Sequence, residues 1–389
     1  MEKQKIVKLF LEKGYQLDPE LLDYLFNNQE HVEFLLEKLS SYKGKSVLTL
    51  ETVKSIKPDR VTVLRSYKKQ PKKISVDDVN SLLKNRYEKL SQILLRRLEL
   101  VRVISINRIT QKLRNFSVIG LVRSKDEGKH SLLVEDNTGE AEVFFDEGSK
   151  KEFNSILLDD VLGLVCEAEG GRIFVKKVIY PDIPFKKEVS KTEEDVYCLF
   201  LSNVCMDSEK FDKKHFKKFL DWVKDWNKRN LLIFVVGGIS SKPEDVEEFL
   251  KKVSYEQTYL LRSKDDAEHN VFAFEDPALI KIDGLTIFLS HGDVIGKYVE
   301  QLKTPVEQTC LLLLKKRHLN PTVELPEVYP EDDYFLERVP DIIVCGTSKN
   351  PTFLNYKGTT IVSCGNFIDI PIFWLINLKT REIFKIDFT

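Results

Sequence analysis

The stretch "VYCLFLSNVCMDSEKF", Val196–Phe211, places an apolar run directly before a polar turn, and the helical pattern "KKHFKKFLDWV" follows almost at once. A short apolar run bounded in this way predicts a buried strand whose end carries a loop. Loops at strand ends are where binding and catalytic side chains gather. Asn203 and Cys205 occupy this loop, so their chemistry bears directly on what the strand end can do.

The same alternation continues from this stretch to the end of the chain. Apolar runs such as "NLLIFVVGG", "LTIFLSHG" and "DIIVCGTS" alternate with helical patterns such as "EDVEEFLKKV". This order predicts an α/β domain over residues 195–389, whose final strands have an antiparallel pattern. We expect any functional site in its strand-end loops.

Residues 83–185 predict a lead-in helix followed by a small barrel. The helix pattern has one apolar face, formed by Tyr87, Leu90, Leu94 and Leu98. The basic residues around that face are Arg86, Lys89, Arg96 and Arg97. Several short strand patterns follow, and the turn Asn137-Thr138-Gly139 joins two of them as a hairpin. A closed barrel of this length, with the hairpin "VEDNTGEAEV", is typical of the OB type.

OB barrels often bind single-stranded nucleic acid on aromatic side chains above a basic groove. Phe144 and Phe145 are adjacent in a strand pattern, so at most one of them faces such a groove. The sequence therefore favours a structural barrel over a nucleic-acid-binding one.

The first part of the chain predicts a small helical domain over residues 1–57. Helical spacing places Ile6, Leu9 and Phe10 in one stripe, and Asp18-Pro19 has the pattern of an N-cap and a first-turn proline. A basic linker, residues 58–82, follows. It contains candidate phosphate contacts for DNA, which are Lys68, Lys69, Lys72 and Lys73.

Composition limits the classes of function that this chain can have. The 389 residues carry 60 basic and 61 acidic side chains, which excludes a polycation that coats nucleic acid over its whole surface. Six widely spaced cysteines, with no C-x-x-C pair, indicate buried reduced thiols in an intracellular protein. The sequence has neither a signal-peptide pattern nor a membrane-spanning run, so we expect a soluble, cytoplasmic protein with no membrane partner.

The loops of residues 195–389 resemble, in their order, those of the calcineurin-like metallophosphoesterases. That family holds two divalent cations with carboxylate, amide and imidazole groups at successive strand ends. On this pattern, the ligand positions fall on Asn203, Cys205, Gly238, Lys264, Asp265, His291, Thr347 and Lys349. Only His291 keeps a ligand of the family, so the resemblance implies that an ancestral two-metal site, for manganese or a similar ion, is lost.

Two opposite expectations follow for metal binding. Lys264 and Lys349, if they point inward, would repel a dication strongly and exclude it. In that case the chain has no catalytic residue and no cofactor. The alternative is a rearranged zinc site built from Cys205, Asp207, Asp265, Asp266 and His291.

The chain as a whole resembles the small subunits of the archaeal family-D DNA polymerases, relatives of the B subunits of eukaryotic replicative polymerases. The motifs that carry this resemblance are "IVKLFLEKGYQLDPELLDYL", "LLRRLELVRVISINRI", "VEDNTGEAEVFF", "VKKVIYPDIP" and "LLKKRHLNPTVELPEVYPEDDYFLERVPDIIVCG". The resemblance implies a multi-domain α+β fold with an N-terminal helical domain, an OB barrel and a phosphoesterase-like α/β sandwich. It also implies a large catalytic partner subunit, bound through its zinc-bearing C-terminal region, and primer-template DNA within the complex.

We therefore predict a non-catalytic accessory subunit of a replicative DNA polymerase. The alternative is an active metal-dependent 3'-to-5' exonuclease with altered ligands, and a third hypothesis is an OB barrel that binds single strands alone. A sliding clamp is a further possible partner. Its candidate contacts are Gln4, Val7, Phe10 and Leu11, whose spacing also fits a helix core face.

Overall fold

The computed structural model describes residues 3–27, 32, 36, 39, 47–49, 60–66, 75–111, 113–184, 187–226, 230–253, 257–267, 273–323, 332, 334–346 and 349–389. The chain divides into two compact units, Met1–Thr62 and Val63–Thr389. The predicted DNA contacts in the basic linker, at positions 68, 69, 72 and 73, lie outside the described residues. Within the range predicted as a linker, 58–82, the structure contains strand β3 (Val61–Ser66) and the start of helix α5 (Val76–Leu94).

The first unit is built around helices α1 (Lys3–Glu12) and α2 (Pro19–Asn27), with a short parallel pair of strands, β1 (Gln16–Leu17) and β2 (Val47–Leu48). Asp18 caps α2, because its carboxylate accepts a hydrogen bond from the Leu21 amide at 2.8 Å. Phe10 is fully buried in the core of this unit. The sliding-clamp motif therefore places its aromatic residue inside the unit, which opposes its use as a clamp contact.

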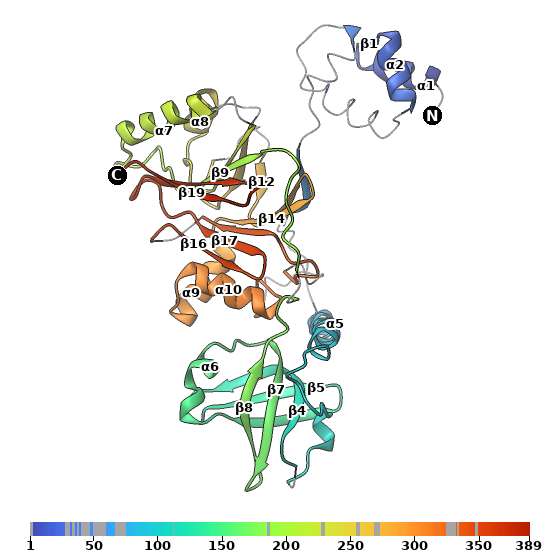
Figure 1. Cartoon of the computed structure of the whole chain (residues 1–389), viewed down its shortest axis with the longest axis vertical. Helices are drawn as coiled ribbons and strands as arrows, with labels where there is room; N and C mark the ends of the chain where they lie inside the picture. The colour runs from blue at the N-terminus through green and yellow to red at the C-terminus, as the bar shows by residue number, and fades with distance from the viewer. Residues whose placement is uncertain are drawn as a thin grey trace. The chain divides into compact units, whose positions relative to one another are not determined.

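The second unit contains a closed barrel of strands in the order β4-β5-β6-β8-β7 (Figure 1). The strands are β4 (Phe116–Asp126), β5 (Ser131–Asp136), β6 (Gly139–Phe144), β7 (Val161–Glu169) and β8 (Arg172–Ile179). The predicted hairpin joins β5 to β6, and Asp136 fixes its turn by accepting the amides of Thr138 at 2.7 Å and Gly139 at 3.1 Å. β6 and β8 pair in parallel and complete the ring. Short helices η1 (Ile106–Arg108), η2 (Glu147–Ser149) and α6 (Lys150–Asn154) flank the strands.

Helix α5 precedes the barrel and begins at a capping box, in which the Ser75 hydroxyl and the Asp78 carboxylate each accept the other's backbone amide. Its apolar face packs on the barrel through Leu90, Leu94 and neighbouring side chains. Two details of the predicted helix are wrong. Arg86 is buried rather than part of a basic surround, and the helix ends at Leu94, so Arg96, Arg97 and the 93 % exposed Leu98 lie beyond it.

The rest of the second unit is two six-stranded sheets between two helical layers. One sheet has the order β12-β11-β10-β9-β18-β19 and the other has the order β16-β17-β15-β14-β13-β3. Helices α7 (Lys213–Trp226) and α8 (Pro243–Val253) cover the first sheet, and α9 (Asp293–Leu302) and α10 (Val306–Lys316) cover the second (Figure 1). The strands of the first sheet are β9 (Tyr197–Leu201), β10 (Leu231–Val236), β11 (Thr258–Arg262), β12 (Ala273–Glu275), β18 (Ile372–Asn377) and β19 (Ile383–Asp387).

The second sheet comprises β3 with β13 (Ala278–Ile282), β14 (Leu285–Ser290), β15 (Ile342–Cys345), β16 (Thr352–Tyr356) and β17 (Thr359–Ser363). Its central strands β14, β15 and β17 are parallel, as are β9, β10 and β11 in the first sheet. The edge hairpins of both sheets are antiparallel, which agrees with the pattern of the last strands in the sequence. Among the helices that the structure describes, none combines the length and the apolar character needed to cross a membrane.

Candidate functional site

The candidate site lies where β9, β10 and β14 end, because the next residues of these strands meet across the two sheets. Asn203 follows β9, Gly237 and Gly238 follow β10, and His291 follows β14. Backbone hydrogen bonds hold the first two loops together, from Asn203 to the Gly237 carbonyl at 3.0 Å and from Cys205 to the Gly238 carbonyl at 2.9 Å. The strand-end convergence predicted from the sequence is therefore present.

A series of side-chain hydrogen bonds connects the residues at this point. The Asn203 Oδ1 atom and the His291 Nε2 atom are 3.0 Å apart, and the Asn203 Nδ2 atom donates to Asn366 Oδ1 at 2.8 Å. Asn366 in turn donates to the Asp369 carboxylate at 3.2 Å. The imidazole nitrogen and the amide oxygen that a metal would need as ligands thus bind one another.

The glycines after β10 leave no room for longer side chains. A Cβ atom on Gly238 would lie 2.2 Å from Asn203 Oδ1, and one on Gly237 would lie 2.4 Å from His291 Cδ2. Both glycines have positive φ, at 74° for Gly237 and 72° for Gly238, a region that favours glycine. The resemblance to the metallophosphoesterases would place a bridging carboxylate at position 238. In this chain the Asn203 side chain fills the space that such a carboxylate would need.

The loop after β11 differs from its predicted role. Asp265 and Lys264 are both exposed, whereas the next residue, Asp266, faces the β10 loop. Its carboxylate accepts the amides of Gly238 at 2.9 Å and Ile239 at 2.8 Å, and that of Ser263 at 2.9 Å. Asp266 is thus a structural link between two loops, and its oxygens are engaged by backbone donors.

The predicted exclusion of metal by inward-pointing lysines is wrong in its mechanism. Lys264 and Lys349 are exposed, and Thr347 lies outside the described residues. Asn203 and His291 lie beside the two glycines, so a longer side chain at position 237 or 238 would collide with one of them. Gly346 after β15 is equally confined, because a Cβ there would lie 2.4 Å from the Val236 carbonyl oxygen.

Cys205 is half-buried in the loop after β9. Burial first, and then the negative charges of Asp207, Asp266 and Asp369, raise the pKa of the Cys205 thiol to about 11. Asp207 is bonded elsewhere, as it accepts the Ser241 amide at 3.0 Å. Among the residues that the structure describes, no group of three or more histidine, cysteine or acidic side chains is arranged to hold a metal ion.

The barrel surface gives limited support for stacking of nucleic-acid bases. Phe145 is buried in the barrel core, while Phe144 is half-buried against Phe174, with ring centroids 6.2 Å apart. The guanidinium of Arg172 lies 5.2 Å from the Phe144 ring. The two adjacent phenylalanines thus differ in burial, and the half-buried Phe144 ring is already covered on one side.

A second cluster, which the sequence analysis missed, lies where the barrel meets the sheets. Arg86 of α5 donates to both carboxylate oxygens of Asp332, at 2.9 and 2.8 Å, and also to the Pro321 carbonyl. His318 Nε2 lies 2.7 Å from Asp332, and His318 Nδ1 accepts the Asn320 amide at 3.1 Å, so the imidazole is the neutral Nε2–H tautomer.

Burial and charge set the protonation of this cluster. Burial first, and then the positive charge of Arg86, lower the pKa of His318 to about 4. Burial alone would raise the pKa of Asp332, but the hydrogen bonds and charges of His318 and Arg86 together hold it well below its usual value. The cluster is therefore an Arg86–Asp332 ion pair with a neutral histidine bonded to it.

A separate buried ion pair joins α10 to the barrel. Lys316 at the end of α10 contacts the Asp160 carboxylate and donates to the Ser155 carbonyl at 2.9 Å. Their side chains are 2 % and 1 % exposed. Asp160 also accepts the Leu157 amide at 2.7 Å. Burial raises the pKa of Asp160 and lowers that of Lys316, so each charge depends on its partner.

We call these five residues, Arg86, Asp160, Lys316, His318 and Asp332, the barrel–sheet junction. Two of them, Lys316 and His318, come from the segment "KKRHLNP" at the end of α10, part of one of the motifs that carry the family resemblance. A run of charged residues before a strand was the available signal, but a sequence cannot show that it is buried. The structure gives this run its physical role, which is to bind the barrel and α5 to the sheets.

Curated relatives match most of this chain. The DNA polymerase II small subunit of Thermoplasma acidophilum is 24% identical over 423 residues, covering 93% of this chain and 86% of the relative. The protein of the same name from Archaeoglobus fulgidus is 23% identical, with 92% and 90% covered. Over most of its length the chain is thus similar to proteins named DNA polymerase II small subunit. The homologue from Pyrococcus abyssi is 26% identical over 75% of this chain, which spans 57% of that longer protein.

Other comparisons are less specific. No family model matches the chain. Solved structures that resemble it include an archaeal phosphodiesterase, with a TM-score of 0.33, 13% identity and coverage of 50% of this chain and 100% of the other. Vacuolar protein sorting 29 from Cryptosporidium parvum also has a TM-score of 0.33 and 13% identity, covering 51% of this chain and 93% of the other.

Proposed function

We propose that this protein is a non-catalytic accessory subunit of a replicative DNA polymerase, which holds a large catalytic subunit and helps to position DNA. The observation that carries the proposal is homology to polymerase small subunits over most of the chain, combined with strand-end loops whose candidate ligands bond to one another. A subunit built in this way contributes assembly rather than metal chemistry.

The finer fold assignments support the same proposal. A five-stranded barrel in which β6 and β8 pair in parallel has the connectivity of an OB fold. Two sheets between helical layers, with loops meeting at parallel strand ends, suit a calcineurin-like phosphoesterase. We infer that α1 and α2 belong to a separate N-terminal helical domain, consistent with the boundary at Thr62.

The proposed partners are the large catalytic subunit, through its zinc-bearing C-terminal region, and primer-template DNA held within the complex. Near-neutral net charge argues against strong DNA binding by this chain alone. The DNA contacts therefore depend on the complex.

Co-expression with the large subunit tests the proposal. A single complex that survives gel filtration at physiological salt is expected, and separate elution of the two chains would count against it. A digest of single-stranded DNA with a free 3' end, run on this chain alone with Mn²⁺, tests the nuclease alternative. Activity that disappears in His291→Ala would replace the accessory role with the exonuclease.

A further inference from the structure

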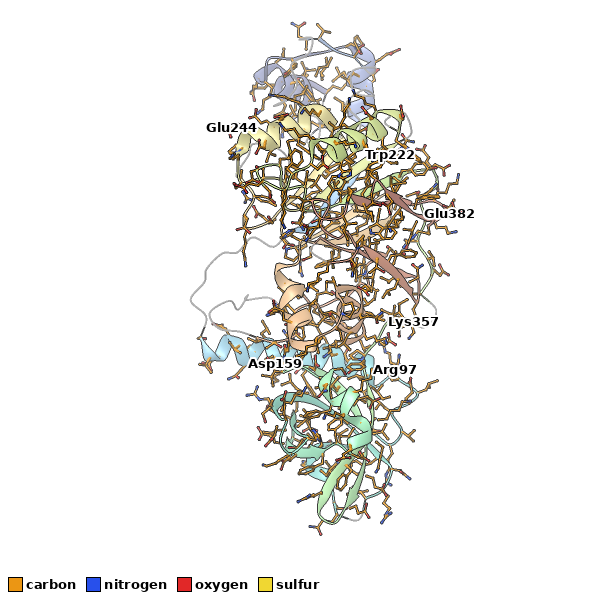
Figure 2. The ribbon with its side chains drawn as sticks, turned by 90° about the vertical axis from the view of Figure 1, so that its left-hand side faces the viewer. Arg97, Asp159, Trp222, Glu244, Lys357 and Glu382 are labelled. Carbon is orange, nitrogen blue, oxygen red and sulfur yellow. The ribbon has the colours of Figure 1, made fainter. Side chains whose placement is uncertain are left out.

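The first sheet ends at strand β19, which lies beyond β18. In the part of the chain that the structure describes, β19 pairs with a neighbouring strand on one side alone. An edge strand of this kind presents unpaired main-chain donors and acceptors, so a further strand can pair with it. Figure 2 labels Glu382, the residue before β19, and Trp222 of the helix α7 that covers the same sheet.

The hydrogen bonds to β18 show which main-chain groups of β19 are left for a further strand. The Phe388 amide, one residue after β19, donates to the Pro371 carbonyl at 3.1 Å. Main-chain groups alternate in direction along a strand, so the even-numbered residues of β19 bond to β18. The odd-numbered residues therefore direct their amides and carbonyls toward the open edge, and these residues are Ile383, Lys385 and Asp387.

Two of these odd-numbered residues carry opposite charges. The side chains of Lys385 and Asp387 are 47 % and 39 % exposed, and their Nζ and Oδ2 atoms are 3.3 Å apart. An exposed ion pair of this kind contributes little to stability, so it can be exchanged for a pair with another strand. Edge charges of one sign would repel a second copy of the same strand. A lysine and an aspartate two residues apart are instead complementary to the same two residues running in the opposite direction.

The other face of β19 carries an exposed aromatic side chain. Ile386 and Phe388 pack against the core beneath α7, where the rings of Phe388 and Phe373 have their centroids 5.7 Å apart. Phe384 points to the same face, since side chains two residues apart share a face of a strand, yet it is 41 % exposed. A strand added to β19 would cover this ring and extend the apolar layer.

We propose that the edge of β19 pairs with the β19 edge of a second copy of this chain, antiparallel about a twofold axis at Ile386. In this register Lys385 of each copy lies opposite Asp387 of the other, and Phe384 lies opposite Phe388. Odd-numbered residues meet odd-numbered ones, so the outward amides and carbonyls of the two strands bond to each other. The interface is isologous, which means that every contact occurs twice.

Charge selects this register among those that the main chain permits. A twofold axis at Lys385 would place two ammonium groups opposite each other, and an axis at Asp387 would do the same with two carboxylates. Like charges directly opposite each other destabilise a strand pair, whereas opposite charges stabilise it. An axis at Phe384 would place Lys385 opposite Ile383 and give no ion pair. The axis at Ile386 gives two cross-strand ion pairs.

Sedimentation equilibrium of the full-length chain tests the proposal by measuring the Kd of the dimer. Lys385→Asp and Asp387→Lys each replace two cross-strand ion pairs with two like-charge contacts, so each should raise Kd about tenfold or more. The double variant with both substitutions exchanges the charges and should return Kd to within about threefold of the wild type. Lys281→Asp is the control, because Lys281 is an exposed lysine on β13, which lies between β14 and β3. It should change Kd less than about twofold.

A further variant tests main-chain pairing without a change of register or of charge sign. Lys385→Pro removes an amide that faces the open edge and leaves the bonds between β19 and β18 in place, so it should abolish the dimer. Circular dichroism spectra and thermal melts confirm that each variant is folded.

A wild-type chain that sediments as a monomer up to its solubility limit would overturn the proposal. A dimer whose Kd is unchanged in Lys385→Asp and in Lys385→Pro would overturn it as well, by placing the interface elsewhere. Loss of the dimer in both single charge variants without recovery in the double variant would contradict the register. The measurement uses this chain alone, so none of these results bears on the proposed accessory role.

Discussion

The strand-end loops and the barrel–sheet junction use polar side chains in opposite ways. At the strand ends, Asn203 and His291 hydrogen-bond to each other beside two glycines. At the junction, buried ion pairs join segments more than 150 residues apart in sequence, since Lys316 contacts Asp160 and Arg86 contacts Asp332.

This difference shows where removal of one side chain costs most. A hydrogen bond between uncharged side chains contributes about 1 kcal/mol to the free energy of unfolding. Its donor and acceptor can be replaced together at modest cost. A buried charge that loses its partner is destabilised by about 3–5 kcal/mol. The chain thus depends on buried charge pairs to hold its barrel against its sheets, whereas the ends of β9, β10 and β14 are joined by hydrogen bonds.

The largest expected effect comes from breaking the pair between α10 and the barrel. Lys316→Ala leaves Asp160 buried without its partner, so the free energy of unfolding should fall by about 3–5 kcal/mol. Urea denaturation followed by tryptophan fluorescence measures this loss. The neighbouring Lys315→Ala, which removes an ammonium 5.0 Å from the Tyr356 ring, is the control and should cost about 1 kcal/mol or less. If Lys316→Ala and Lys315→Ala lose the same free energy of unfolding, the buried Lys316–Asp160 pair contributes no more to stability than the Lys315 contact does.

The next effect is a dependence of stability on pH through His318. Its pKa is about 4 in the folded chain and about 6.5 when unfolded. Between these values the unfolded chain binds a proton that the folded chain does not, so stability falls as pH decreases from 6.5 to 4. The loss is about 3 kcal/mol in total.

Denaturation midpoints of the wild type and of His318→Gln, measured across this pH range, isolate the contribution of His318 to the pH dependence of stability. The difference in denaturation midpoint between the wild type and His318→Gln should change between pH 6.5 and pH 4 and stay constant above pH 7. Parallel curves from pH 7 to 4 would contradict the buried neutral imidazole.

A smaller effect is expected when a carboxylate is returned to the strand ends. Gly238→Asp places a side chain against Asn203 at a φ of 72°, so it should destabilise the chain by about 2–3 kcal/mol. We expect it not to create metal binding, because the new carboxylate would lie against Asn203. Thermal melts with and without Mn²⁺ measure both outcomes, with Gly139→Ala, whose Cβ meets nothing within 4 Å, as the control. Stabilisation of Gly238→Asp by Mn²⁺ would show that the loops can reopen.

Sequence patterns predicted the parts of the fold that depend on local chemistry. The turn at Asn137-Thr138-Gly139 and the cap at Asp18 were found because both depend on neighbouring residues. Arg86 was placed on a polar surface, since periodicity cannot reveal a partner 246 residues away. In the candidate site, the positions of Asn203 and His291 were predicted, but the loop after β11 was offset by one residue, from Asp265 to Asp266.

The smallest effect concerns the exposed lysines near the strand ends. Lys264 and Lys349 are solvent-exposed, so alanine at both positions should change the free energy of unfolding by about 0.5 kcal/mol or less. The double variant should bind Mn²⁺ no better than the wild type. Tighter Mn²⁺ binding in the double variant would restore electrostatic repulsion as the reason for metal exclusion.

The central claim is that the strand ends are closed to paired divalent cations by the packing of Asn203, His291 and the adjacent glycines. Calorimetric titration of the full-length chain with Mn²⁺ tests it most directly. The account predicts no saturable binding at these loops and a titration unchanged by His291→Ala. Saturation at two ions per chain, weakened by His291→Ala, would contradict it.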